Sequence, residues 1–182
     1  GVIGLGGGSP MDVAKAVSYF SINSIEIEKC YGVNKLKNKR TPLIQIPTTA
    51  GTGSEVTPIA IFTLKNQQKM GIVDPILYAD CAILDAELTL ELPKKITAYS
   101  GIDAMVHAIE AYTTKLKKNP ISDALAKKAL NLLGSNIRTV VEEPSNKEAR
   151  EKMLLGSTLA GMAFANAPCA AVHALAYPIG AK

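Results

Sequence analysis

The hydrophobic pattern of the chain changes near residue 93. Before it, apolar residues form short runs, rich in β-branched side chains and bounded by Gly, Pro or polar clusters, which predicts β-strands. One helical pattern, at residues 13–20, follows the first of these runs. This part of the chain is therefore predicted to be mixed α/β. The strands are expected at residues 2–5, 42–46, 59–64, 69–73 and 81–84.

From Lys94 onward, apolar residues recur at helical spacing over much longer segments. Prolines punctuate these segments near the expected helix starts, where the missing N–H does least harm. We therefore predict two domains, a mixed α/β domain of residues 1–93 and an all-helical domain of residues 94–182, with a boundary near Leu92–Lys94. The helices are expected at residues 96–115, 121–141, 147–166 and, more briefly, 170–175.

Composition narrows the class of protein. The 182 residues are 47% hydrophobic and 20% charged, which provides enough apolar material for a core. The net charge is only +4 and no aromatic residues interleave with the lysine clusters, so we expect no nucleic-acid partner. Three widely spaced cysteines show no metal-ligand or disulfide pattern, which is typical of a reducing cytoplasm. The uncharged stretch 159–181 is weakly apolar and interrupted, which favours buried helices over a membrane span.

The first candidate site is the run of three glycines at residues 6–8, between the first strand and its helix. Ser9 is a good N-cap, Pro10 suits the first helical position, and the Asp12 carboxylate is placed to reach back to the cap. Backbone N–H groups at such a helix start bind phosphate, and no side chain blocks them. A tight turn is the alternative, but three consecutive glycines exceed what a turn requires. The run differs from the usual G-x-G-x-x-G motif.

The second candidate is the loop at residues 47–57, which follows a predicted buried strand and is dense in hydroxyl groups and glycine. Small donors on a flexible backbone suit a segment that lies along the phosphates and sugar of a nucleotide. The same composition is typical of a solvated turn. Composition alone does not decide between these two interpretations.

The third candidate is the pair Asp103 and His107, which lie four residues apart in a predicted helix and so share one face. A carboxylate and an imidazole placed in this way can hold one divalent metal ion. A surface ion pair or a satisfied core histidine is the commoner explanation of such a pair. The chain has only one other histidine, His173, and it lies in the uncharged stretch. Neither histidine is where a surface residue is expected, which favours the metal site.

Four segments, in this order, resemble the iron-containing (group III) alcohol dehydrogenase family: residues 6–9 with Asp12 and Lys15, then 47–55, 101–112 and 161–178. The resemblance implies a Rossmann-like dinucleotide-binding part followed by a helical metal-binding domain, the dehydroquinate synthase-like architecture. It also implies interconversion of an alcohol and an aldehyde or ketone by hydride transfer with NAD or NADP. Fe²⁺, or in its place Zn²⁺, is the implied metal, and we expect a homo-oligomer.

The resemblance assigns roles to individual residues as well. Asp103, His107 and His173 match three of the four metal ligands of the family, and the fourth, a histidine, is expected beyond Lys182. Tyr177 stands where many relatives have a histidine with a proton-relay role, and its ordinary pKa of about 10 suits neutral pH less well. The residues that match the cofactor site are Gly7, Gly8, Ser9, Asp12, Thr48, Thr49, Ser54, Thr57 and Lys69. Gly7, Gly8 and Ser9 would hold the pyrophosphate, Thr48, Thr49, Ser54 and Thr57 would line the cofactor, and Lys69 would contact the ribose.

Members of this family are longer than this chain, so we interpret it as a fragment. It lacks the opening strands and the acidic residue that helps to select NAD over NADP. Three alternatives stay open: a zinc-dependent glycerol dehydrogenase-like enzyme of the same fold, a carbon–oxygen lyase of the dehydroquinate synthase type, and a catalytically inactive nucleotide-binding fragment. The four segments match the lyase less well. Metal content and activity distinguish the enzymes from the inactive fragment.

Overall fold

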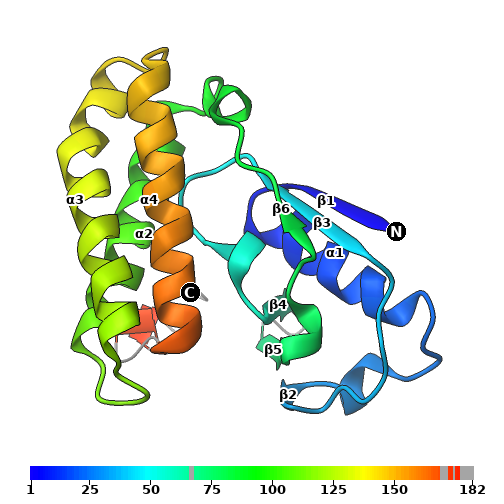
Figure 1. The fold of residues 1–182 in the computed structure, drawn as a ribbon. Coiled ribbons are helices and arrows are strands. Elements are labelled where there is room, and N and C mark those ends of the chain that lie inside the picture. The colour runs from blue at the N-terminus through cyan, green and yellow to red at the C-terminus, as the bar shows by residue number, and fades with distance from the viewer. Residues whose placement is uncertain (66–67, 169–171, 174, 177–182) are drawn as a thin grey trace.

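The computed structural model describes residues 1–65, 68–168, 172–173 and 175–176. Within the described residues, all strands come before residue 94, and the three long helices begin at residue 94 or later. The strands lie with helix α1 on one side of the molecule, and the long helices lie on the other (Figure 1). This arrangement places the glycine turn and the hydroxyl-rich loop opposite the helix that carries both Asp103 and His107.

A parallel sheet forms the centre of the α/β part. It contains β1 (Val2–Gly6), β3 (Leu43–Pro47) and β6 (Cys81–Ala82) in the order β1-β3-β6, with Val2 opposite Leu43. Helix α1 (Gly8–Phe20) follows β1 directly and packs against β1 and β3. The carboxyl ends of β1 and β3 therefore lead into the two predicted cofactor segments at the same edge of the sheet.

A second small sheet contains β2 (Gly32–Val33), β5 (Lys69–Val73) and β4 (Ile59–Thr63) in the order β2-β5-β4. The strands β4 and β5 pair antiparallel, and β2 pairs parallel to β5. The sequence predicted β4 and β5 closely but missed β2, because two residues are too few to show a periodic pattern. In the described residues, four short 3-10 helices lie in the segments between the longer elements: Ile27–Lys29, Ser54–Val56, Pro75–Leu77 and Ala86–Thr89.

The helical part consists of α2 (Lys94–Thr113), α3 (Pro120–Glu142) and α4 (Lys147–Asn166) in the described residues. The side chains of Asn119 and Asn146 cap α3 and α4 by accepting hydrogen bonds from Ser122 and Ala149 N–H groups. These helices confirm the predicted ones, and the bounds of α4 coincide with the prediction. Of the short helix expected at 170–175, residues 170, 171 and 174 lie outside the described residues, and 172, 173 and 175 are helical.

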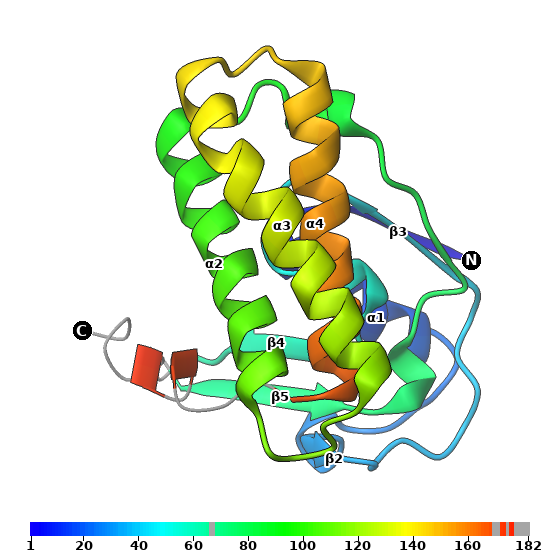
Figure 2. The ribbon, with the colours of Figure 1, turned by 60° about the vertical axis from the view of Figure 1, so that its left-hand side comes forward.

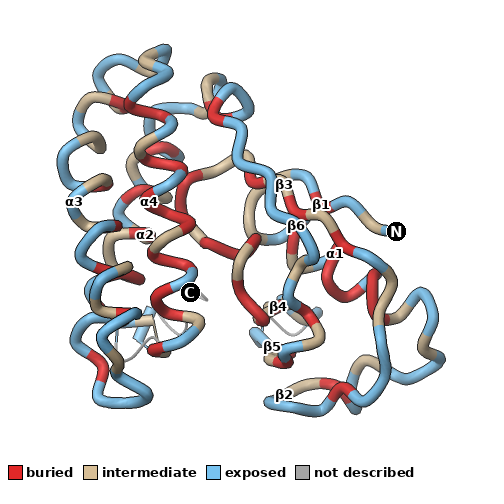
Figure 3. Tube along the Cα trace, in the orientation of Figure 1, coloured by how far each residue is buried: buried red, intermediate tan, exposed pale blue. Residues whose placement is uncertain are grey.

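Small side chains allow the three long helices to pack closely. The core between them holds fully buried alanines, together with Leu133, Val140 and Leu154. Figure 2 shows the helices running alongside one another, and Figure 3 marks the buried residues along each of them. No helix in the described part of the chain combines the length and apolar character that a bilayer span requires.

The start of α1 differs from the prediction. The helix begins at Gly8 with Gly7 as N-cap, and no side chain caps it, so the predicted cap by Ser9 is wrong. Gly6, with a φ of +146°, turns the chain into the helix one residue before Ser9. The Asp12 carboxylate does not reach back to the cap, because it accepts hydrogen bonds from the Ser54 hydroxyl and the Ile61 N–H. Both carboxylate oxygens of Asp12 thus bond to residues far along the chain and not to the start of the helix.

Candidate metal centre and cofactor cleft

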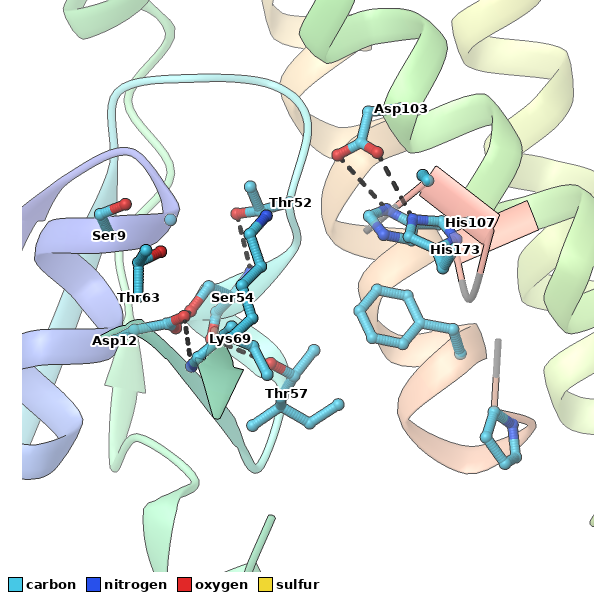
Figure 4. Close-up of a pocket in the computed structure, with 16 residues that line it drawn as sticks. Ser9, Asp12, Thr52, Ser54, Thr57, Thr63, Lys69, Asp103, His107 and His173 are labelled. Carbon is cyan, nitrogen blue, oxygen red and sulfur yellow. Dashed lines mark hydrogen bonds and ion pairs between the residues drawn. The ribbon is translucent and has the colours of Figure 1, made fainter. Parts of the chain in front are cut away.

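A cleft of about 610 Å³ is lined by both parts of the chain. Helix α1, the loop after β3 and the strands β4 and β5 form one wall, while α2, α4 and the segment around His173 form the other. Figure 4 shows the two walls facing each other, with hydroxyl groups on the first and imidazoles on the second. The residues lining it are Gly8, Ser9, Asp12, Thr52, Ser54, Thr57, Ile59, Ile61, Thr63, Lys69, Asp103, His107, Phe164, Pro168, His173 and Ala176.

Asp103, His107 and His173 converge on one side of the cleft. Each offers one ligand atom, and these atoms all lie within 4.8 Å of one another. One carboxylate oxygen of Asp103 lies 3.5 Å from Nε2 of His173, and the other lies 4.0 Å from Nδ1 of His107. The two imidazole rings stack with centroids 4.3 Å apart (Figure 4). Helix α2 places the first two residues on one face, and the fold brings the third to them.

The chemistry of these donors fits a divalent cation. His107 is buried, and burial lowers its pKa below the ordinary value against the opposing effect of Asp103, which favours the neutral imidazole that metals require. Nδ1 of His107 faces the carbonyl oxygen of Gly51 at 3.3 Å. A hydrogen bond donated from Nδ1 leaves Nε2 to bind the ion. One carboxylate and two imidazoles without thiolate suit Fe²⁺ or Zn²⁺.

Sequence reasoning missed Glu110, which is buried on α2 one turn after His107. Its carboxylate accepts hydrogen bonds from Nδ1 of His173 and from the backbone N–H of Val172, the latter at 2.8 Å. The first of these bonds leaves Nε2 of His173 directed towards Asp103. The only signal in the sequence was the position of Glu110, three residues after His107 in the same helix.

A Glu110→Gln variant is expected to bind a divalent cation about 10- to 100-fold more weakly, because the amide places an N–H₂ donor against one of two existing donors. Titration with Co²⁺ or Zn²⁺ in a competition assay measures this change. Glu55→Gln is the matched control, since Glu55 is equally buried but bonds to Thr158 and to no histidine. Equal cation affinity in Glu110→Gln and the unmodified protein would contradict this role.

The predicted cofactor residues fall into two groups, those that line the cleft and those that do not. Gly8, Ser9, Asp12, Ser54, Thr57 and Lys69 line the cleft, whereas Gly7, Thr48 and Thr49 do not. Thr48 instead donates its N–H to the carbonyl of Gly6 at 2.9 Å, and the Thr49 side chain lies beside Gly7. Tyr177, predicted as a proton relay, lies outside the described residues. The cofactor and metal roles of these residues stay predictions.

Two family models match nearly the whole chain. "Iron-containing alcohol dehydrogenase" matches residues 1–86, and "Fe-containing alcohol dehydrogenase family, C-terminal" matches residues 97–182. The chain therefore belongs to the iron-containing alcohol dehydrogenase family, which confirms the resemblance seen in its motifs. The predicted fold class, a Rossmann-like part followed by helices, is confirmed as well.

Individual relatives cover the chain from end to end. It is 45% identical over 175 residues to the sulfoacetaldehyde reductase of Bilophila wadsworthia, covering 96% of this chain and 45% of the relative. It is 44% identical to long-chain-alcohol dehydrogenase 1 of Geobacillus thermodenitrificans, covering 100% of this chain and 46% of the relative. The solved alcohol dehydrogenase from Oenococcus oeni superposes with a TM-score of 0.93 at 40% identity, over 98% of this chain and 46% of that one. The chain thus spans about half the length of these relatives.

A solved relative also carries a nicotinamide cofactor. The sulfoacetaldehyde reductase from Bifidobacterium kashiwanohense, crystallised in complex with NAD⁺, superposes with a TM-score of 0.91 at 40% identity. The match covers 97% of this chain and 47% of that one. The chain is therefore similar to a protein whose structure was solved with NAD⁺ bound.

Proposed function

We propose that the protein containing this chain interconverts an alcohol and an aldehyde or ketone, with NAD or NADP as hydride carrier and Fe²⁺ or Zn²⁺ as metal. One observation carries the proposal: the glycine turn at the start of α1 and the cluster of Asp103, His107 and His173 line the same cleft. Phosphate binding at one wall would hold the cofactor while the other wall holds the reacting oxygen. Family membership and the NAD⁺ complex of a relative support the cofactor class.

Asp103, His107 and His173 would hold the cation, with a further ligand from the longer protein. When bound, a divalent cation would acidify an alcohol hydroxyl and, in the reverse direction, polarise the carbonyl. Phe164 lies against His107 with ring centroids 4.5 Å apart, so an apolar ring adjoins one side of the cluster. At the opposite wall, the N–H groups at the start of α1 point to where a pyrophosphate would lie.

We also propose that the two walls belong to separate domains, divided near Leu92–Lys94. The strands of the described residues all precede this point and the long helices all follow it, which supports the division. A cleft between two domains is a common position for an active site that brings a cofactor and a substrate together. The free thiols of Cys30 and Cys81 support a reducing compartment such as the cytoplasm. A homo-oligomer stays part of the proposal.

The proposal is tested on the full-length protein. NADH and NADPH oxidation is followed with aliphatic aldehydes, and bound iron and zinc are measured by elemental analysis. We expect turnover that is lost on chelation and restored by Fe²⁺ or Zn²⁺. Restoration by Zn²⁺ alone favours the glycerol dehydrogenase-like alternative, which uses the same three residues. A folded protein that binds nucleotide but holds no metal and shows no turnover would contradict the proposal and indicate an inactive nucleotide-binding module.

A Gly8→Val variant is expected to bind NADH at least about tenfold more weakly. A Cβ atom at Gly8 would lie 2.9 Å from the side chain of Thr52, so the larger side chain must displace Thr52 and enter the cleft at the phosphate end. Fluorescence titration of NADH measures the change. Gly134→Val is the control, because Gly134 is exposed on α3 with nothing within 4 Å of an added Cβ. Unchanged affinity in Gly8→Val would contradict the phosphate-loop role.

A further inference from the structure

Lys15 is a completely buried cation beside the cofactor wall of the cleft. Its side chain is 0% exposed and extends from α1 towards the turn formed by residues 54–57. The ammonium group donates to Ser54 Oγ at 2.7 Å, to the Ile59 carbonyl at 2.6 Å and to Thr57 Oγ1 at 3.3 Å. An ammonium has three N–H donors, so the protein itself uses all of them. Lys15 therefore has no donor left for a ligand.

Asp12, which is half-buried, completes this network. One of its carboxylate oxygens accepts from the Ser54 hydroxyl at 2.6 Å and lies 3.5 Å from the Lys15 ammonium, and the other accepts from the Ile61 N–H at 2.9 Å. The single hydroxyl hydrogen of Ser54 is thus directed at Asp12 while its oxygen accepts from Lys15. Ser54 lines the cleft, but its hydroxyl donates to the protein.

Thr57 is similarly engaged. Its side chain is buried, its oxygen accepts from Lys15, and its hydroxyl is 3.4 Å from the Ser54 carbonyl in a donating geometry. The side-chain hydroxyls of Ser54 and Thr57 therefore shape the turn from within. The turn therefore contributes to the cleft by setting where its backbone and neighbouring residues such as Thr52 lie.

The same turn is attached to the opposite wall. Glu55, between the two hydroxyl residues, is buried and accepts a hydrogen bond from Thr158 of α4 at 2.7 Å. The turn is therefore held on one side by Lys15 and Asp12 of α1 and on the other by α4 (Figure 3 shows it as a buried segment between the two parts). Its shape fixes where the cofactor wall lies relative to the histidine cluster.

We infer that Lys15 is a positioning residue for dinucleotide binding, which holds the 54–57 turn in the shape that receives the cofactor without touching the cofactor itself. The inference rests on the proposed function. Burying an ammonium group costs more than burying an apolar chain of the same length, so stability alone does not explain a lysine here. Burial lowers the pKa of Lys15 to about 8, while Asp12 opposes this, so the group is still mostly protonated at pH 7.

The test uses Lys15→Met in the full-length protein, since methionine keeps much of the apolar length and removes the three donors. At pH 7 the dissociation constant for NADH, from calorimetry, is expected to rise at least about tenfold. Cation content and the KM for aldehyde at saturating NADH are expected to stay within about twofold. This split separates positioning of the cofactor wall from a general loss of structure.

Arg150→Met is the matched control. Arg150 is also a buried cation, but it bonds to Thr97 and the Pro144 carbonyl at the far end of the helical part. Its loss is expected to lower stability while NADH affinity changes less than about twofold. An equal rise in the dissociation constant for both variants would overturn the inference, because it would show a non-specific effect of lost stability.

A double-mutant cycle tests the route of the effect. If Lys15 acts through Ser54, the loss of NADH affinity in Lys15→Met with Ser54→Ala is expected to be smaller than the sum of the two single losses. Should Lys15→Met fail to fold, Ser54→Ala and Thr57→Val each remove one acceptor, and each is expected to weaken NADH binding about threefold or more. Unchanged NADH affinity in the folded variants overturns the inference alone. An unmodified protein that binds neither NADH nor NADPH overturns the proposed function itself.

Discussion

An Asp103→Asn variant is expected to bind a divalent cation more than about 100-fold more weakly and to lose nearly all aldehyde reduction. Asp103 is the one carboxylate among the three described residues of the cluster, and its two oxygens lie 3.5 Å from Nε2 of His173 and 4.0 Å from Nδ1 of His107. The amide keeps the shape of the side chain but removes the negative charge that offsets the cation. Loss of a direct ligand should exceed the 10- to 100-fold cost usual for an outer partner. Metal per chain after dialysis and competition titration with Zn²⁺ measure the change.

Asp123→Asn is the matched control for this variant. Asp123 is also a helical aspartate, but it pairs with Lys118 at the start of α3, away from the cluster. We expect normal cation content and NADH affinity in the control, and normal NADH affinity in Asp103→Asn. Stoichiometric, tight cation binding by Asp103→Asn would remove Asp103 from the ligand set and with it the proposed metal centre.

A Gly53→Ala variant is expected to lose about 2–4 kcal/mol of unfolding free energy. Gly53 has a φ of +61°, a left-handed conformation that side chains disfavour, and an added Cβ would lie 2.6 Å from the Cα of Gly161 in α4. Two backbones approach closely here, so the clash cannot be relieved by rotating a side chain. The added methyl group is therefore expected to push the loop at residues 47–57 away from α4.

Chemical denaturation measures this change against Gly134→Ala. Gly134 lies on the exposed face of α3 with open space around it, so alanine there is expected to stabilise the helix by about 0.5–1 kcal/mol. A lower unfolding free energy in Gly53→Ala together with a higher one in Gly134→Ala would show that close packing, and not the loss of a glycine as such, controls stability at residue 53. A loss below about 1 kcal/mol in Gly53→Ala would contradict the close approach of the loop to α4.

The secondary structure was largely predictable because it depends on neighbouring residues. Apolar periodicity located the strands and long helices, and the asparagines at 119 and 146 now cap α3 and α4. The failures are instructive. Ser9 has the right chemistry for a cap, but Gly7 takes that position, and Asp12 binds Ser54 and Ile61 across the fold instead. A local preference for a capping position is lost when the fold offers a half-buried carboxylate hydrogen-bond donors from distant residues.

The candidate site likewise combines local features that the sequence showed with contacts between distant residues that it did not show. Helical spacing alone placed Asp103 and His107 on one face, and the glycine run marked the start of α1. The sequence showed no link between Glu110 and His173, which lie 63 residues apart, nor between Lys15 and its acceptors, which lie 39 to 44 residues away. Those contacts depend on how whole elements pack.

By itself, the sequence determined the order of the long helices and of the strands other than β2, the run of small residues that leaves a helix start open, and the pairing of a carboxylate with an imidazole one turn apart. Only the tertiary structure decided that His173 reaches Asp103, that Glu110 holds it, and that the Ser54 hydroxyl is directed into the protein. The physical reason is range. Backbone geometry repeats over a few residues and shows in a local pattern, whereas a buried polar group takes whichever partner the packing of the chain brings within hydrogen-bonding distance.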